Sequence, residues 1–88
     1  MAKIEEKVVV NKTHGLHARP ATIFVQMANK FNSSVMVEKD GEVVDGKSII
    51  AILSLGVNKG MEVKLVVEGD DAIDTMGDLR KFLEGNDD

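Results

Sequence analysis

The residues whose types and spacing could do chemistry together lie in the segment 14–21, with His17 and Arg19 as the central pair. Pro20 suits the first turn of a helix, where its missing N–H costs nothing, so a helix should begin close behind His17. The first N–H groups of a helix, here those of Ala18 and Arg19, point outward and carry partial positive charge. Arg19 adds a forked cation that fits phosphate oxygens. The pattern predicts an anion site beside a nucleophilic imidazole.

Two plainer interpretations of the same segment have to be weighed. An isolated His-x-Arg-Pro is more often a loop histidine beside a helix start, with a solvated arginine. His14 is expected to be only a turn residue. Two histidines three residues apart could also suggest a metal, but the chain has no cysteine and no nearby carboxylate completes a ligand shell. We therefore expect no metal and no cofactor.

The elements that must position this segment can be predicted from apolar spacing and turn residues. Helical spacing marks two longer segments and one short one, and period-two alternation or β-branched runs mark four strands. Asp40-Gly41 between two of the strands is a hairpin signal. The expected strands are 5–10, 35–39, 42–45 and 61–67, and the expected helices are 20–31, 48–55 and 70–84. This β-α-β-β-α-β-α order predicts an α+β open-faced sandwich, a four-stranded antiparallel sheet with three helices on one face.

A second motif lies in the middle of the chain. Residues 41–48 satisfy the phosphate-loop pattern G-x-x-x-x-G-K-[ST], which makes a small nucleotide-binding protein the alternative function. Val43-Val44 reads as a strand, however, and Glu42 and Asp45 would set negative charge against phosphate. A domain of that class also needs a parallel sheet larger than 88 residues allow. Ser48 is expected instead to cap the short helix that follows it.

Composition limits the remaining classes. The 88 residues are enough for one small domain, 1–88, with an aliphatic core because aromatic residues make up only 3%. The net charge of −4 argues against nucleic acid as a partner. The segment 1–7 is charged and unlike a signal peptide, and no apolar run is long enough to span a membrane. We expect a cytoplasmic protein, and a monomer.

Two blocks of sequence carry a resemblance to a known family. Gly-Leu-His-Ala-Arg-Pro-Ala at 15–21, followed by Phe24-Val25-Gln26, is similar to the active-site signature of HPr, the histidine-containing phosphocarrier of the bacterial sugar phosphotransferase system. The block 46–56, Gly-Lys-Ser-Ile-Ile-Ala-Ile-Leu-Ser-Leu-Gly, resembles the regulatory-serine region of the same family. The sequence departs from the family's usual pattern at His14, Ala51 and Gly77, none of which is a reacting group.

The resemblance implies a specific function. His17 matches the histidine that accepts a phosphoryl group on Nδ1 from phosphorylated enzyme I, which phosphoenolpyruvate charges, and passes it to enzyme IIA. Arg19 matches the arginine beside it. Such a protein is a carrier, not an enzyme with turnover of its own. Ser48 matches the serine that HPr kinase/phosphorylase modifies in many Gram-positive bacteria, where a catabolite control transcription factor is a further partner.

The short helix after Ser48 is the expected docking surface. Ile49, Ile50 and Leu53 lie on one side of it, and Ile52 and Leu55 lie on the other. A helix that is apolar all round is normally buried, but at the edge of so small a domain one side should stay exposed. The resemblance implies that partners contact this helix. The alternative is that all five side chains belong to the core.

Overall fold

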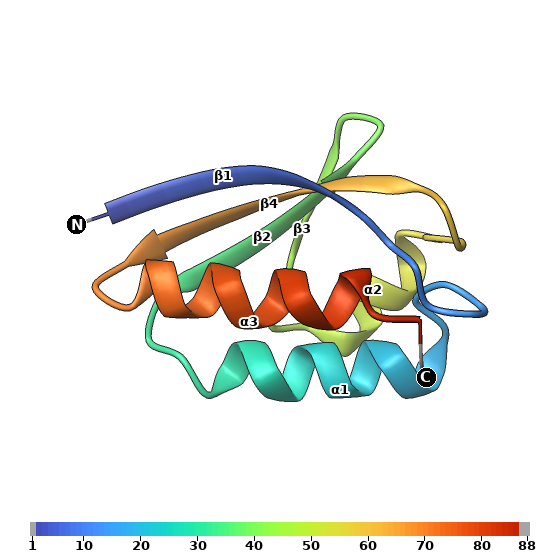
Figure 1. The fold of residues 1–88 in the computed structure, drawn as a ribbon, viewed down its shortest axis with the longest axis horizontal. Helices are drawn as coiled ribbons and strands as arrows, with labels where there is room; N and C mark the ends of the chain where they lie inside the picture. The colour runs from blue at the N-terminus through green and yellow to red at the C-terminus, as the bar shows by residue number, and fades with distance from the viewer. Residues whose placement is uncertain (1, 87–88) are drawn as a thin grey trace.

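The computed structural model describes residues 2–86, which form a four-stranded antiparallel sheet with three helices on one face (Figure 1). The sheet order is β1-β4-β2-β3. The elements follow the predicted order: β1 (Ala2–Val9), α1 (Ala18–Asn29), β2 (Ser34–Lys39), β3 (Glu42–Asp45), α2 (Ile49–Ser54), β4 (Glu62–Gly69) and α3 (Ala72–Glu84). The predicted open-faced sandwich is confirmed, and no helix within the described residues is long and apolar enough to cross a membrane.

The hairpin between β2 and β3 shows how a short local signal fixes a turn. Asp40 and Gly41 both have positive φ, 52° and 85°, as a two-residue type I′ turn requires. The register follows from that turn, with Lys39 opposite Glu42 and Met36 opposite Asp45. The two-residue connection predicted at Asp-Gly is therefore confirmed.

The core lies between the sheet and the helices. Period-two alternation places Val63, Leu65 and Val67 of β4 on the inner face, where each is at most 1% exposed. Helical spacing brings Phe24 of α1 and Leu79 of α3 against them, both fully buried. The core is aliphatic, as the composition predicted, and Phe24 is the one aromatic side chain among its fully buried members.

Several predicted boundaries were wrong by two or three residues. Helix α1 begins at Ala18, not residue 20, and ends at Asn29 before Phe31. The apolar stripe continues past Asn29 because Phe31 N–H still donates to the Ala28 carbonyl, at 3.3 Å, in a tighter final turn. Strand β1 begins three residues earlier than expected because Ala2, an exposed residue, pairs with Gly69 at the far end of β4.

The start of α3 also differs from the prediction. Asp70 and Asp71 precede the helix, and Asp71 is its N-cap. The Asp71 carboxylate accepts hydrogen bonds from the N–H groups of Asn32 and Ser33, at 2.8 and 2.9 Å, and from the Ser33 hydroxyl. The Ser33 hydroxyl and the Asn32 N–H are the main causes that lower the pKa of Asp71 to about 2. The side chain thus ties the loop after α1 to the start of α3.

Candidate functional site

The loop that carries His17 is held by backbone hydrogen bonds to three other parts of the chain. Val10 exchanges two such bonds with the turn before β4, since its N–H donates to Met61 and its carbonyl accepts from Gly60. Asn11 N–H donates to the Leu83 carbonyl at the end of α3, and Leu16 N–H donates to the Val57 carbonyl, both within 2.9 Å. Residues distant in sequence therefore fix both ends of the loop.

Gly15 lets this loop approach the segment after α2. Its φ is +69°, in the left-handed region, and a Cβ there would lie 2.2 Å from the Val57 carbonyl oxygen and 2.6 Å from Asn58 Cα. The close approach places Leu16 in the core, where it is 4% exposed. His17, the next residue, is thereby set at the surface directly above the first turn of α1.

His17 is the N-cap residue of α1. Its backbone is extended, with φ −77° and ψ −174°, and its carbonyl accepts the first helical hydrogen bond, from Ala21 N–H at 2.9 Å. The side chain makes no capping hydrogen bond, so the imidazole does not take part in capping α1. The ring is half-buried and its Nε2 atom is fully buried.

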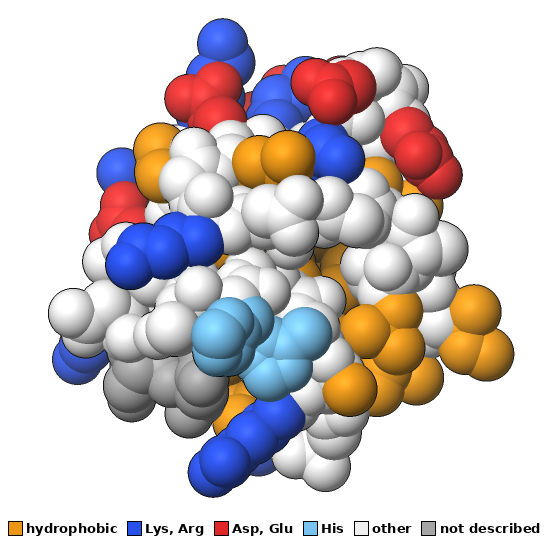
Figure 2. Space-filling model, turned by 90° about the vertical axis from the view of Figure 1, so that its right-hand side faces the viewer, with side chains coloured by type: hydrophobic (Ala, Val, Ile, Leu, Met, Phe, Trp, Pro, Cys, Tyr) orange, Lys and Arg blue, Asp and Glu red, His pale blue; other side chains and the backbone are white. Residues whose placement is uncertain are grey.

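The first turn of α1 supplies donors next to that ring. By their position at the helix start, the N–H groups of Ala18 and Arg19 have no acceptor within the helix, and Pro20 has no N–H to contribute. Arg19 is exposed, while Pro20 is buried and anchors the turn. Figure 2 shows the two histidines as one continuous surface patch with a basic side chain bordering it. The three residues expected to form an anion site, His17, Ala18 and Arg19, are consecutive at one helix end.

His14, which the sequence suggested was only a turn residue, contacts His17. The two imidazole rings lie with their centroids 5.6 Å apart and their planes at 68°, an edge-to-face arrangement. Among the described residues no group of three or more His, Cys, Asp or Glu side chains could hold a metal ion. The sequence feature that could have indicated this contact is the pair of histidines three residues apart, His14 and His17, with Gly15 between them.

Lys12 is the other residue of the loop whose environment the sequence did not indicate. It is 1% exposed, and its Nζ lies 3.9 Å from the centroid of the Phe82 ring. A cation over an aromatic face is attracted by the ring quadrupole. Lys12 and Phe82 therefore add a further contact between the His17 loop and α3.

Ser48 is the N-cap of α2, as predicted. Its Oγ accepts a hydrogen bond from Ala51 N–H at 3.3 Å, and its carbonyl accepts from Ile52 N–H at 3.0 Å. The residue is half-buried at the helix start. A charge added to its hydroxyl would lie beside the positive end of a short helix.

The short helix α2 has one buried and one exposed side. Ile52 and Leu55 are 0% and 4% exposed, whereas Ile50 and Leu53 are 77% and 40% exposed and Ile49 is half-buried. Hydrophobic side chains gather beside the two histidines in Figure 2. The alternative that all five side chains belong to the core is therefore wrong, and an apolar surface remains at the end of the molecule that carries His17.

The phosphate-loop pattern at 41–48 does not form a phosphate loop. Glu42–Asp45 is strand β3, paired with β2. The Gly46 N–H donates to Val35 and the Lys47 N–H donates to the Asp45 carboxylate, while Lys47 Nζ donates to the Phe31 carbonyl. The groups that would have to bind polyphosphate are used within the fold, which removes the basis of the nucleotide-binding alternative.

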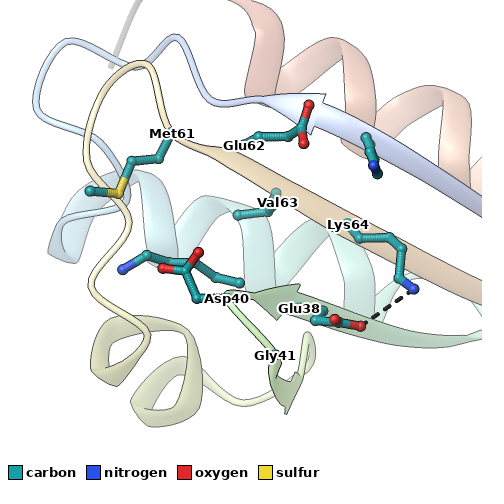
Figure 3. Close-up of a pocket in the computed structure, with 9 residues that line it drawn as sticks. Glu38, Asp40, Gly41, Met61, Glu62, Val63 and Lys64 are labelled. Carbon is teal, nitrogen blue, oxygen red and sulfur yellow. Dashed lines mark ion pairs between the residues drawn. The ribbon is translucent and has the colours of Figure 1, made fainter.

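A hollow on the open face of the sheet is separate from these residues. Figure 3 shows Glu38, Glu62 and Lys64 lining it, with Lys64 Nζ 3.4 Å from the Glu38 carboxylate. The hydrogen bond and charge of Glu38 raise the pKa of Lys64, and Glu5 contributes from β1. Because charges of both signs neutralise each other there, the hollow has no clear anion or cation preference.

Comparisons with known proteins agree with this geometry. A protein-family model described as "PTS HPr component phosphorylation site" matches residues 4–85. The HPr-like protein Crh of Halalkalibacterium halodurans is 43% identical over 92% of this chain and 96% of its own length. The phosphocarrier protein HPr of Bacillus anthracis has a similar structure, with a TM-score of 0.91, 38% identity, and coverage of 94% of this chain and 99% of its own.

A further similar structure is that of Crh from Bacillus subtilis, described as a swapped, intertwined dimer. It has a TM-score of 0.75 and 43% identity, and the match covers 92% of this chain and 93% of that chain. The family match spans nearly all of the described residues, and it includes both the helix start at His17 and the capped helix at Ser48. The chain belongs to the HPr family of phosphocarrier proteins of the phosphotransferase system.

Proposed function

We propose that this protein is a cytoplasmic phosphocarrier, in which His17 accepts a phosphoryl group from phosphorylated enzyme I and passes it to an enzyme IIA domain. The observation that carries the proposal is the position of His17 at the start of α1, with Nε2 buried and the Ala18 and Arg19 donors beside it. The test is incubation with enzyme I and phosphoenolpyruvate, followed by intact-mass measurement. One added phosphoryl group supports the proposal, and an unchanged mass contradicts it.

The chemistry is a transfer between nucleophiles. The lone pair of Nδ1 attacks phosphorus, a new N–P bond forms, and the bond from phosphorus to the donor breaks, while Nε2 keeps the ring proton. The helix end favours the resulting anion by roughly 0.3–1 kcal/mol. A carrier benefits from so modest an interaction, because each additional 1.4 kcal/mol of binding would reduce release about tenfold.

We expect Arg19 to assist transfer and to contribute little to folding, because its side chain is exposed at the first turn of α1. A charge-assisted hydrogen bond is worth about 1.5–3 kcal/mol. Arg19→Ala should therefore slow phosphoryl transfer by at least about tenfold, with little change in melting temperature. Lys30→Ala, which removes an exposed cation at the other end of α1, is the matched control and should leave the rate unchanged. An unaltered rate with a large stability loss in Arg19→Ala would assign it a structural role.

We propose a regulatory role for Ser48 through phosphorylation by a kinase of the HPr kinase/phosphorylase class. The exposed Ile50 and Leu53 side chains of the following helix, with Ile49, are the proposed contact surface for enzyme I. Phosphorylation adds about −1.5 to −2 charges next to that surface, and a hydrated dianion is costly to cover. The helix end should tolerate the charge within the folded domain.

Ser48→Asp should reproduce this effect in weaker form. We expect the variant to melt at or above the parent temperature and to accept phosphate from enzyme I with a raised apparent KM. Ser48→Ala is the matched control, because it removes the cap without adding charge. It should lose about 1 kcal/mol of stability and keep parent kinetics. Equal transfer kinetics for the parent, Ser48→Asp and the genuinely phosphorylated protein would leave Ser48 as a helix cap only.

A second candidate function is that of an interaction protein that does not carry phosphate, since one relative of this chain is named only as HPr-like. His17 and Arg19 favour the carrier, and the enzyme I experiment separates the two functions.

We also propose a monomer, because β1 pairs with β4 of the same chain and Arg80 of α3 binds Glu6 of β1. Sedimentation velocity would reveal a dimer instead.

A further inference from the structure

The turn that leads into β4, residues 57–61, contacts both ends of the loop that carries His17. At the start of the loop, Val10 exchanges two backbone hydrogen bonds with this turn. Near the end of the loop, Leu16 N–H donates to the Val57 carbonyl at 2.9 Å. Residues 57–61, the supporting turn, therefore hold the loop on two sides, and a change in the shape of this turn must reach the loop.

Met61 closes the supporting turn with its side chain as well as with its backbone. Its Sδ accepts a hydrogen bond from Asn58 N–H at 3.3 Å, and its own N–H donates to the Asn58 carbonyl at 3.1 Å. Figure 3 shows the sulfur beside the segment of chain that leads into β4. A thioether sulfur is a weak acceptor, and here it is the one that meets a backbone N–H. The sulfur is therefore part of the structure of the turn.

The same sulfur lies in a side chain that solvent reaches. Met61 is half-buried and lines the hollow on the open face of the sheet. Among the other described methionines, Met76 is 3% exposed and protected in the core, whereas Met27 and Met36 are half-buried. Met61 differs from these described methionines because its sulfur accepts a backbone hydrogen bond. An oxidant that reaches it would alter a structural contact.

We propose that Met61 is an oxidation site, at which a peroxide loosens the loop that carries His17 and slows its phosphorylation. The sulfur lone pair attacks one peroxide oxygen, an S–O bond forms, the O–O bond breaks, and the second oxygen leaves as water. Sulfur thereby loses two electrons, which reduce the peroxide, and methionine sulfoxide is the product. The effect on phosphorylation rests on the proposed function of His17.

The added oxygen changes the supporting turn because of where the sulfur lies. The sulfoxide oxygen is polar and projects beyond the sulfur, so Asn58 N–H cannot keep its present distance from Sδ while it donates to that oxygen. Either the backbone at Asn58 moves outward, or the Met61 side chain leaves the turn. Both movements disturb the backbone next to Val57, the acceptor for Leu16 N–H.

Backbone amide exchange tests the proposal without a partner protein. The protein is treated with hydrogen peroxide, and peptide mass mapping identifies which methionines carry an added oxygen. In the oxidised parent, the N–H groups of Val10 and Leu16 should exchange about two- to twelvefold faster, the range that one hydrogen bond provides. Gly46 N–H donates to the Val35 carbonyl at the far end of the sheet, and its exchange rate should stay unchanged.

Two substitutions assign the effect to a particular sulfur. Met61→Leu keeps an apolar side chain of similar volume that peroxide does not oxidise. Its exchange rates at Val10 and Leu16 should be the same before and after treatment. Met36→Leu, the matched control, removes a half-buried methionine from β2 and should respond to peroxide as the parent does. Because each variant is compared with itself before treatment, the loss of the sulfur acceptor in Met61→Leu does not affect the comparison.

Three results would overturn the proposed oxidation site. They are a sulfoxide at Met61 with unchanged exchange at Leu16, equal acceleration in peroxide-treated Met61→Leu, and a Met61 that stays reduced while Met36 is oxidised. None of these measurements depends on enzyme I, so a chain that enzyme I does not phosphorylate would reject the carrier function and leave the oxidation result standing. In a chain that enzyme I does phosphorylate, oxidation should slow transfer in the parent and not in Met61→Leu. Equal transfer rates before and after oxidation of the parent would overturn the link to His17.

Discussion

A His17→Ala variant should accept no phosphoryl group from phosphorylated enzyme I and should keep the parent fold. The loss should be complete because no other side chain at the start of α1 is a comparable nucleophile; Arg19 beside it is a cation that cannot be deprotonated. The fold should survive because the His17 side chain makes no capping hydrogen bond, and its role in α1 is carried by the backbone carbonyl. Intact mass after incubation and a thermal melt measure the two expectations.

The control for this experiment uses the chemistry of the phosphoryl bond. Phosphohistidine is lost in acid and phosphoserine is retained, so acid treatment distinguishes a group on His17 from one on Ser48. The parent should lose its label in acid, and His17→Ala should have none to lose. Acid-labile labelling that persists in His17→Ala would indicate that His14, the other histidine of the chain, accepts the phosphoryl group. That result would contradict the assignment of His17.

The order of elements could be predicted because each one has a local signal. The strand β4 alternates strictly, α3 carries Met76, Leu79 and Leu83 on one stripe, and Asp40-Gly41 specifies its own turn. The ends of the elements were less predictable because tertiary pairing decides them. Nothing in the local sequence of Ala2 indicates that it will find Gly69 across the sheet.

The candidate site could be predicted in part, for a related reason. His17, Ala18 and Arg19 are neighbours in sequence, so a single helix start brings them together. The supports of the site come from elsewhere in the chain. Leu83, Met61 and Val57 hold the loop through backbone groups, which carry no signature in the side-chain sequence. For the same reason Asp71, which lies within the predicted helix 70–84, instead precedes α3, and its carboxylate binds the loop at Asn32 and Ser33.

The connection between the His17 loop and α2 is the part of the site most sensitive to a single change. The Val57 carbonyl, which follows α2 closely in the chain, accepts the hydrogen bond from Leu16 N–H at 2.9 Å. The same oxygen would lie 2.2 Å from a Cβ at Gly15. A methyl group there cannot be accommodated while the hydrogen bond stays in place. Relief of the clash must therefore move the residue that precedes His17.

Gly15→Ala should be the most destabilising of the substitutions considered, and it should impair phosphorylation as well. A left-handed backbone costs a residue with a Cβ about 1–2 kcal/mol, and overpacking against backbone atoms adds roughly 1–3 kcal/mol. For a domain of this size the sum should lower the melting temperature by at least about 10 °C. Below that temperature, transfer from enzyme I should still be slower than in the parent, because the loop that presents His17 is displaced.

Gly60→Ala is the matched control for Gly15→Ala. Gly60 also has a positive φ, +88°, but a Cβ there would meet no atom within 4 Å. It should therefore show the backbone cost alone, about 1–2 kcal/mol, with normal phosphoryl transfer. Chemical denaturation of the two variants, each measured against the parent, isolates the contribution of the close approach to Val57. Equal losses of stability in Gly15→Ala and Gly60→Ala, with equal transfer rates, would show that the contact between the His17 loop and the segment after α2 has no role in holding the site.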